Sequence, residues 1–169
     1  TITLLGDIDV KSFTTGGVTQ VVPITKSITI DGKGYTIKQN KKCNNPVAIL
    51  DISGSVDVTI KNVTFDGING GAVIRTVGSD ITIDNCVFQN GTHTQYQGLL
   101  RLALGNATVT NSKFIDNNCN MVLTFNFDAG NPTDELVVDN CLFENNTCND
   151  TAVIYYADDP QKCTLTNSK

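Results

Sequence analysis

The sequence predicts an all-β fold, a right-handed, single-stranded parallel β-helix of about five to six coils, on the strength of three features. Strand and turn formers such as Thr, Asn and Gly occur along all 169 residues, whereas helix formers are scarce. A motif of alternating apolar residues followed by Asn recurs along the chain, and a second apolar run separates its copies. Such short strands cannot enclose a core alone, but laps stacked about 4.8 Å apart can.

The recurring motif is a unit in which apolar and polar residues alternate, Asn follows, and Phe comes three residues after Asn. Its copies begin at Val58, Ile81, Ala107, Leu136 and Cys163. Successive Asn residues are 23, 26, 29 and 27 positions apart. Each unit is therefore expected to be one lap of variable length, with a strand, a turn at Asn and an aromatic side chain that returns to the core.

A second apolar run in each lap predicts another short strand. These runs begin at Ala48, Ala72, Leu99, Val122 and Val153. An antiparallel sandwich would also have short strands at regular spacing, but it would not explain the repeated Asn and Phe. A leucine-rich repeat shares the period, yet this sequence has neither a leucine ladder nor a helical pattern in each lap.

We expect a single β-helix domain over residues 1–169, with an N-terminal coil at about 1–26. The segments 1–5 and 19–22 should be edge strands, and 27–37 should be the first full lap, with tight turns at Asp31-Gly32 and Lys33-Gly34. The last repeat stops one residue before its expected Phe. This favours a segment cut from a longer β-helix, whose further coils would stack on its open edge.

Two positions of the repeat are expected to be structural. The Asn side chains should form a ladder in which each amide donates to the carbonyl of its copy, since Asn also tolerates the left-handed turn conformation. They are Asn62, Asn85, Asn111, Asn140 and Asn167. The aromatic side chains should stack in the core, and they are Phe65, Phe88, Phe114 and Phe143.

Composition excludes several partners. The net charge of −5 and the pI near 4.6 leave no basic surface for nucleic acid or an anionic membrane. No apolar run approaches the roughly 20 residues that span a bilayer, so we expect no membrane contact by this segment.

The six cysteines contain no Cys-x-x-Cys pair, and the chain has one histidine, His93, so we expect no metal site and no cofactor. An even number of cysteines favours an oxidising, extracellular compartment.

Cys119 and Cys148 are the predicted disulfide. Each lies five residues after the Phe of its lap, so the two should be stacked about 4.8 Å apart, within the range that a disulfide accepts. Cys86 and Cys141 are also equivalent but two laps apart, which is too far for a bond. Cys163 occupies an apolar strand position and is expected to be a core thiol.

Two short motifs resemble the repeats of chlamydial polymorphic membrane proteins. The segment 70–74, Gly-Gly-Ala-Val-Ile, is similar to one half of that repeat, and the segments 114–117 and 143–146 match its Phe-x-x-Asn half. After Phe65 and Phe88 the third position is Ile68 and Gly91 instead of Asn. Similar repeats occur in adhesin-like surface proteins of methanogenic archaea and some protists. The resemblance implies a secreted or surface-displayed β-helix that takes part in cell adhesion.

Carboxylates provide the alternative, a polysaccharide-processing lyase or glycoside hydrolase. Hydrolases of this kind need two carboxyl groups across the bond, and lyases usually add calcium and a basic residue. The aligned pairs are Asp84 with Asp139 and Asp116 with Glu144. Each of these residues stands alone on its lap, so we expect solvated surface charges and no catalytic residues.

The second strand of each lap predicts the binding face. If Leu50, Ile74, Leu100, Leu123 and Ile154 point inward, the residues before them form an outward apolar column. That column is Ile49, Val73, Leu99, Val122 and Val153. Beside it should stand Asp51, Arg75, Arg101, Thr124 and Tyr155.

Arg and Tyr are enriched at interaction hot spots, and an exposed apolar column marks a contact surface. We therefore expect a protein or glycan of a host or neighbouring cell to dock on this sheet, centred on Arg75, Arg101 and Tyr155. The alternatives are that β-branched residues are simply good strand formers, or that the loop 127–135 covers the column.

Overall fold

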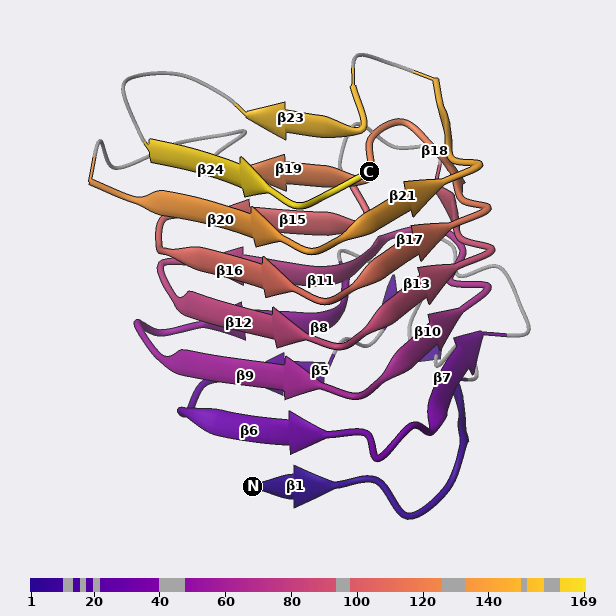
Figure 1. The fold of residues 1–169 in the computed structure, drawn as a ribbon. Coiled ribbons are helices and arrows are strands. Elements are labelled where there is room, and N and C mark those ends of the chain that lie inside the picture. Colours follow the sequence, from indigo (N-terminus) through magenta and orange to yellow (C-terminus); the bar gives the residue numbers. More distant parts are fainter. Residues whose placement is uncertain are drawn as a thin grey trace.

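The structure is a computed structural model that describes residues 1–10, 14–15, 18–19, 22–39, 48–93, 98–125, 133–149, 152–156 and 162–169. Every regular element among these residues is a β-strand. Successive laps stack from the N-terminus at one end to the C-terminal laps at the other (Figure 1). The predicted all-β parallel solenoid is confirmed.

Three parallel sheets run along the stack, and each lap contributes a strand to them in turn. Sheet I consists of β1 (Ile2–Thr3), β6 (Ile28–Asp31), β9 (Asp57–Lys61), β12 (Asp80–Asp84), β16 (Ala107–Thr110), β20 (Glu135–Asp139) and β24 (Lys162–Thr166). Sheet II consists of β2 (Ile8–Val10), β7 (Thr36–Gln39), β10 (Thr64–Asp66), β13 (Val87–Gln89), β17 (Lys113–Ile115) and β21 (Leu142–Glu144). Sheet III consists of β5 (Val22–Ile24), β8 (Ala48–Ser53), β11 (Ala72–Val77), β15 (Leu100–Ala103), β19 (Leu123–Phe125) and β23 (Ile154–Tyr156).

Two smaller sheets complete the described strands. Sheet IV lies between sheets II and III along the chain and consists of β14 (Thr92–His93), β18 (Asn118–Cys119) and β22 (Thr147–Cys148). An antiparallel pair, β3 (Thr14–Thr15) and β4 (Val18–Thr19), stands outside the parallel stack.

The pairing of the repeats is the predicted one. Ile81 of β12 pairs in parallel with Val58 on one side and Ala107 on the other, and Leu136 of β20 pairs with Cys163. Register neighbours therefore occupy equivalent positions of successive laps. Cys163, however, is exposed on the last strand of sheet I, so the expectation that it is a core thiol is wrong.

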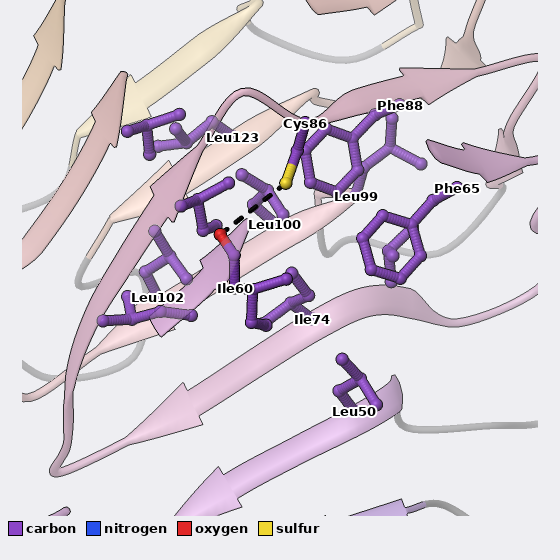
Figure 2. Close-up of a cluster of buried hydrophobic side chains, with 14 of the residues drawn as sticks. Leu50, Ile60, Phe65, Ile74, Cys86, Phe88, Leu99, Leu100, Leu102 and Leu123 are labelled. Carbon is purple, nitrogen blue, oxygen red and sulfur yellow. Dashed lines mark hydrogen bonds between the residues drawn. The ribbon is translucent and has the colours of Figure 1, made fainter. Parts of the chain in front are cut away.

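The core is one column of apolar side chains enclosed by the sheets (Figure 2). The four repeat phenylalanines stack in it with ring centroids 5.1, 4.9 and 4.8 Å apart and nearly parallel planes. Phe65, Phe88 and Phe114 are almost fully buried, whereas Phe143 is partly buried. Large aromatic side chains in offset stacks contribute both area and ring contact to the core.

The predicted outward apolar column on sheet III is wrong. Val73, Leu99 and Val122 are at most 2% exposed and belong to the core, where Figure 2 shows Leu99 beside Leu100. Ile49 is also buried, and Val153 packs against the same core.

A local irregularity of the backbone explains this burial. The carbonyl of Leu99 accepts from both Val73 N and Ile74 N, at 2.7 and 3.3 Å, and the carbonyl of Val153 accepts from Val122 N and Leu123 N. The register stays one residue to one, with Ala72 opposite Ala48 and Ile74 opposite Leu50, so the shared carbonyl marks a local break in strand alternation. Consecutive side chains therefore both reach the core.

The Asn side chains line the bend between sheets I and II, where all five have φ between 50° and 56°. Asn85 donates to Oδ1 of Asn62 and Asn140 donates to Oδ1 of Asn111, both at 2.8 Å. The expected ladder is therefore present at these two steps.

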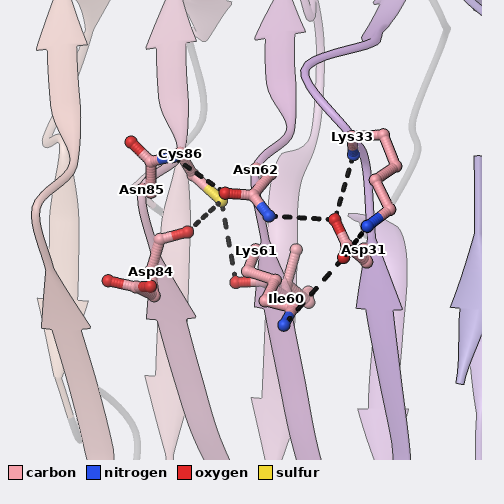
Figure 3. A network of polar contacts seen from close by, with 8 residues as sticks. All are labelled: Asp31, Lys33, Ile60, Lys61, Asn62, Asp84, Asn85 and Cys86. Carbon is pink, nitrogen blue, oxygen red and sulfur yellow. Dashed lines mark hydrogen bonds and ion pairs between the residues drawn. The ribbon is translucent and has the colours of Figure 1, made fainter.

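The ladder prediction is wrong at two other steps. Asn111 and Asn167 donate to the carboxyl groups of Asp84 and Asp139, at 2.7 and 2.8 Å. A carboxylate is a stronger acceptor than an amide oxygen, so it captures the bond wherever Asp precedes the Asn of the lap below. Figure 3 shows the first step, in which Asn62 donates to Asp31 at 2.9 Å.

A second set of asparagines lies at the bend between sheets II and IV, where Asn117 is buried and Asn146 is half-buried. Asn117 Oδ1 accepts from Gly91 N at 2.9 Å, and its Nδ2 donates to Phe88 O at 3.0 Å and to Asn146 Oδ1 at 2.8 Å. Asn146 repeats the pattern one lap on by donating to Phe114 O at 2.8 Å. A Cβ at Gly91 would lie 2.9 Å from Asn117 Oδ1, so glycine leaves the room that this side chain needs.

Candidate functional site

One column of side chains runs along sheet III, each in register with the next. Its members, which we call the sheet III column, are Pro23, Asp51, Arg75, Arg101, Thr124 and Tyr155. Strand alternation positions them, because from Asp51 to Tyr155 each stands between two residues that are buried or packed against the core. The column contains both arginines of the chain.

Asp51 and Arg75 form an ion pair on adjacent strands. Arg75 Nε lies 3.7 Å from Asp51 Oδ1, and both side chains are little more than a quarter exposed. The two atoms are buried, and among the described residues neither has a hydrogen-bond partner. At this distance the contact is electrostatic, so the guanidinium keeps its other donors for further contacts.

Arg101 stands on the other side of Arg75 and is half-buried. Its pKa is lowered by burial and then by the charge of Arg75, while Asp51 acts in the opposite direction. A guanidinium stays charged in spite of such shifts. The centre of the column therefore brings two positive groups together over one negative group.

The upper part of the column differs from the prediction. Thr124 is fully buried, and its hydroxyl donates to Leu100 O at 3.3 Å, so it does not present a polar surface. Tyr155 is half-buried beside it in register. Of the predicted binding residues, Arg75, Arg101 and Tyr155 thus share one column, and the apolar residues lie beneath it.

The carboxylates of sheet I take part in hydrogen bonds of the ladder. Asp84 and Asp139 stand in one column with Thr110 between them, as expected. Asp139 accepts from Thr166 at 2.6 Å and from Asn167, which lower its pKa. A general acid of a glycoside hydrolase needs a raised pKa, so this environment favours a structural carboxylate.

The second predicted pair is not aligned. Glu144 pairs in register with Ile115, not with Asp116. Asp116 has φ of 55°, as Asn145 does one lap later, so these two occupy the equivalent turn position. The one-residue offset places the two carboxyl groups at different points of the lap.

A hollow along the described surface lies away from the sheet III column. It has a volume of about 360 Å³ and follows the bend between sheets I and II, where Asn111, Asn140 and Lys113 line it. Its asparagines are the ladder residues whose amides already bond to one another. The hollow is therefore a furrow along the ladder.

Within the described ranges, no group of three or more His, Cys, Asp or Glu side chains could hold a metal ion. The same residues include no helix long and apolar enough to cross a membrane. Cys119 and Cys148 pair in register on β18 and β22, but both are free thiols, so the structure lacks the predicted disulfide.

Sequence reasoning missed the structural roles of the buried Asn117 and the half-buried Asn146. The signal that could have found them is an Asn three residues after the Phe of two successive laps, with Gly91 at the same position one lap earlier. A polar residue that recurs in an apolar repeat needs hydrogen-bond partners to be buried.

Comparison with known proteins agrees with this geometry. The family described as "Right handed beta helix region" matches residues 26–169. No curated protein matches the chain, and no solved structure matches it. The stacked parallel laps and the family match together place this chain in the right-handed β-helix family.

Proposed function

We propose that this chain is a non-catalytic adhesion module of a secreted or surface-displayed protein. It binds a protein or glycan of a host or neighbouring cell through the sheet III column. The observation that carries the proposal is the register stacking of Asp51, Arg75 and Arg101, with Tyr155 two laps above Arg101. Arg and Tyr side chains combine several donors with large contact area, which is why they dominate binding energy at interfaces.

Two further observations support this proposal over an enzyme. The carboxylates Asp84 and Asp139 are engaged by Thr and Asn donors of the next lap. The Gly-Gly-Ala and Phe-x-x-Asn motifs resemble repeats of surface-displayed adhesins. The extracellular location rests on that resemblance and on the even number of cysteines.

The test compares a double substitution in the column with a matched one elsewhere. Arg101→Ala/Tyr155→Ala removes one cation and one tyrosine from sheet III. The control Lys113→Ala/Tyr35→Ala also removes one cation and one tyrosine. Lys113 is exposed on sheet II, and Tyr35 is exposed just before strand β7 of that sheet. We expect the first variant to lose about tenfold or more in affinity for the protein or glycan that the wild type captures, and the control to lose little.

The probes are a glycan array and intact cells, and circular dichroism checks that both variants are folded. Equal binding by the wild type and the sheet III variant would reject the proposed face. Glycan-array binding identifies a carbohydrate partner, whereas protease-sensitive binding to cells identifies a protein.

The second candidate function is polysaccharide processing, and one observation favours it. A carboxylate and two guanidinium groups, those of Asp51, Arg75 and Arg101, stand together on one outward column. An acid, a base and an anion-binding group are the ingredients of a polysaccharide lyase. Release of unsaturated or reducing-end fragments from acidic polysaccharides, abolished by Arg75→Ala, would establish this function in place of adhesion.

A further inference from the structure

We propose that Cys119 and Cys148 are a redox-responsive pair whose disulfide closes and reopens under mild conditions and tethers the last described lap. The proposal is independent of what the sheet III column binds. Its basis is the position of the two cysteines, which are register neighbours on adjacent strands of sheet IV.

The two cysteines occupy equivalent positions of successive laps. Cys119 of β18 pairs in register with Cys148 of β22, and the backbone bonds Thr147 N to Asn117 O and Asn149 N to Cys119 O hold that register at 2.8 and 2.9 Å. Strands of a parallel pair are about 4.8 Å apart, which is within the Cα separation of disulfides. The backbone therefore brings the thiols within bonding reach.

The same geometry makes the bond labile. Side chains of register neighbours on parallel strands project in one direction, so the Cβ atoms stay about as far apart as the Cα atoms. Relaxed disulfides bring Cβ atoms to about 3.5–4.5 Å, so closure here needs a small shift of β22 towards β18. Strained disulfides have more oxidising potentials and are the ones that cellular thiols reduce.

Two other thiols of the chain, unlike Cys119 and Cys148, are too far apart to form a disulfide. Cys86 and Cys141 stand two laps apart with Ser112 between them, about 10 Å by strand spacing. Their Sγ atoms lie within hydrogen-bond distance of backbone carbonyls of the bend, Asp84 O at 3.4 Å and Asp139 O at 3.4 Å (Figure 3 shows Cys86). These thiols fill a structural position and cannot bond to one another.

The reaction requires a small disulfide as the oxidant, for which glutathione disulfide serves. Cys148 is the half-exposed member and Cys119 is fully buried, so the Cys148 thiolate attacks first. One glutathione leaves, and a mixed disulfide forms on Cys148. The Cys119 thiolate then attacks the Cys148 sulfur and expels a second glutathione. In sum, two protein thiols are oxidised and one glutathione disulfide is reduced to two thiols.

Burial slows this reaction at neutral pH. Burial and the neighbouring Cys148 raise the pKa of Cys119 to about 12, and burial raises the pKa of Cys148 as well. Because only thiolates attack, closure should speed up by about tenfold for each pH unit between about pH 7 and pH 9.

Closure would act on the strands that follow each cysteine. Cys119 lies four residues before β19, and Cys148 lies six residues before β23, which carries Tyr155. β23 is the end strand of sheet III and pairs with β19 alone among the described strands. A bond between β18 and β22, the strands that precede β19 and β23 along the chain, restricts the opening of β23.

The experiment oxidises the wild-type chain with glutathione disulfide and maps disulfides by peptide mass. We expect a Cys119–Cys148 link, thiols at Cys86 and Cys141, and reopening in millimolar reduced glutathione. Hydrogen exchange of the β22 and β23 amides should be at least several-fold slower in the oxidised chain. In the variants Cys119→Ser and Cys148→Ser, the exchange rates should equal those of the reduced wild-type chain, with or without glutathione disulfide.

Three results would overturn the proposal. If the oxidised chain carries only mixed disulfides, or no disulfide, Cys119 and Cys148 are not close enough to bond. A link that resists millimolar glutathione is a permanent cross-link and not a responsive one. Unchanged exchange at β23 on oxidation would show that the bond does not tether that strand.

Discussion

Asparagine has two different roles in this fold, and the backbone distinguishes them. At the bend between sheets I and II, Asn adopts φ near 50°, a conformation that it tolerates better than most residues. At the bend between sheets II and IV, Asn117 is 1% exposed and bonds to Gly91 N, Phe88 O and Asn146. The first role needs the turn conformation, whereas the second needs the side-chain amide.

The buried role leads to the first stability prediction. Asn117→Ala removes the side-chain hydrogen bonds to Gly91 N, Phe88 O and Asn146 at a buried position, so we expect a loss of about 3 kcal/mol in the free energy of unfolding. The control Asn118→Ala removes an exposed acceptor of Asn149 and should cost about 0.5 kcal/mol. Urea unfolding measures both, and equal losses would mean that the buried bonds contribute nothing special.

The hydrogen bonds of the exposed ladder follow one rule that the sequence contains. Asn donates to the side chain of the Asn one lap below, unless Asp stands just before the bend position of that lap, as Asp31 does before Gly32. Asn85 and Asn140 follow the first case, and Asn62, Asn111 and Asn167 follow the second. Since the preference of an amide for a carboxylate is general, these partners could have been predicted.

At the scale of the strand, the two strand types of a lap differ in how well their pattern predicts them. Sheet I strands alternate regularly, so their register and inward faces were predictable from Val58, Ile81 and Ala107. Sheet III strands contain a local break in alternation at Val73 and Val122, where one carbonyl accepts from two consecutive N–H groups. An apolar run does not reveal such a break, so the outward apolar column could not be recognised as core. The Arg75 and Arg101 positions were predictable because alternation is regular around them.

The ladder carboxylates of sheet I predict a pH dependence of stability. Hydrogen bonds, first from Asn62 and then from the Lys33 backbone, lower the pKa of Asp31 to about 2, and Thr166 and Asn167 lower that of Asp139. The folded state therefore binds these protons more weakly than the unfolded state, whose Asp pKa is about 3.9. The stabilisation is complete above that value and is lost as the pH falls towards about 2.

We expect the urea midpoint to fall between about pH 5 and about pH 2. Asp31→Asn should flatten part of this slope, because its amide oxygen still accepts from Asn62 but no longer titrates. Asp57→Asn is the control, since the Asp57 carboxyl accepts no hydrogen bond reported among the described residues. If Asp31→Asn keeps the full slope, the ladder is not the source of the acid sensitivity.

For the whole molecule, stability is approximately a sum over laps, because each lap contacts only its neighbours. The central laps have a stacked ring above and below, and the last described lap does not. Phe88 lies between Phe65 and Phe114 and is 1% exposed, whereas Phe143 stacks on Phe114 alone and is partly buried. The same residue type in the same motif should therefore contribute unequally.

Truncation of the two rings measures this difference. Phe88→Ala removes two ring contacts and opens a cavity in the centre of the column, so we expect a loss of about 4 kcal/mol in the free energy of unfolding. Phe143→Ala removes one ring contact at a half-exposed position and should cost about 2 kcal/mol. Phe88→Leu, which keeps most of the volume, should cost about 1.5 kcal/mol and provides a measurable variant if the alanine variant unfolds.

Urea unfolding followed by circular dichroism gives all three values. Equal losses for Phe88→Ala and Phe143→Ala would contradict the nearest-neighbour description, since they would mean that position in the stack does not decide the contribution of a ring.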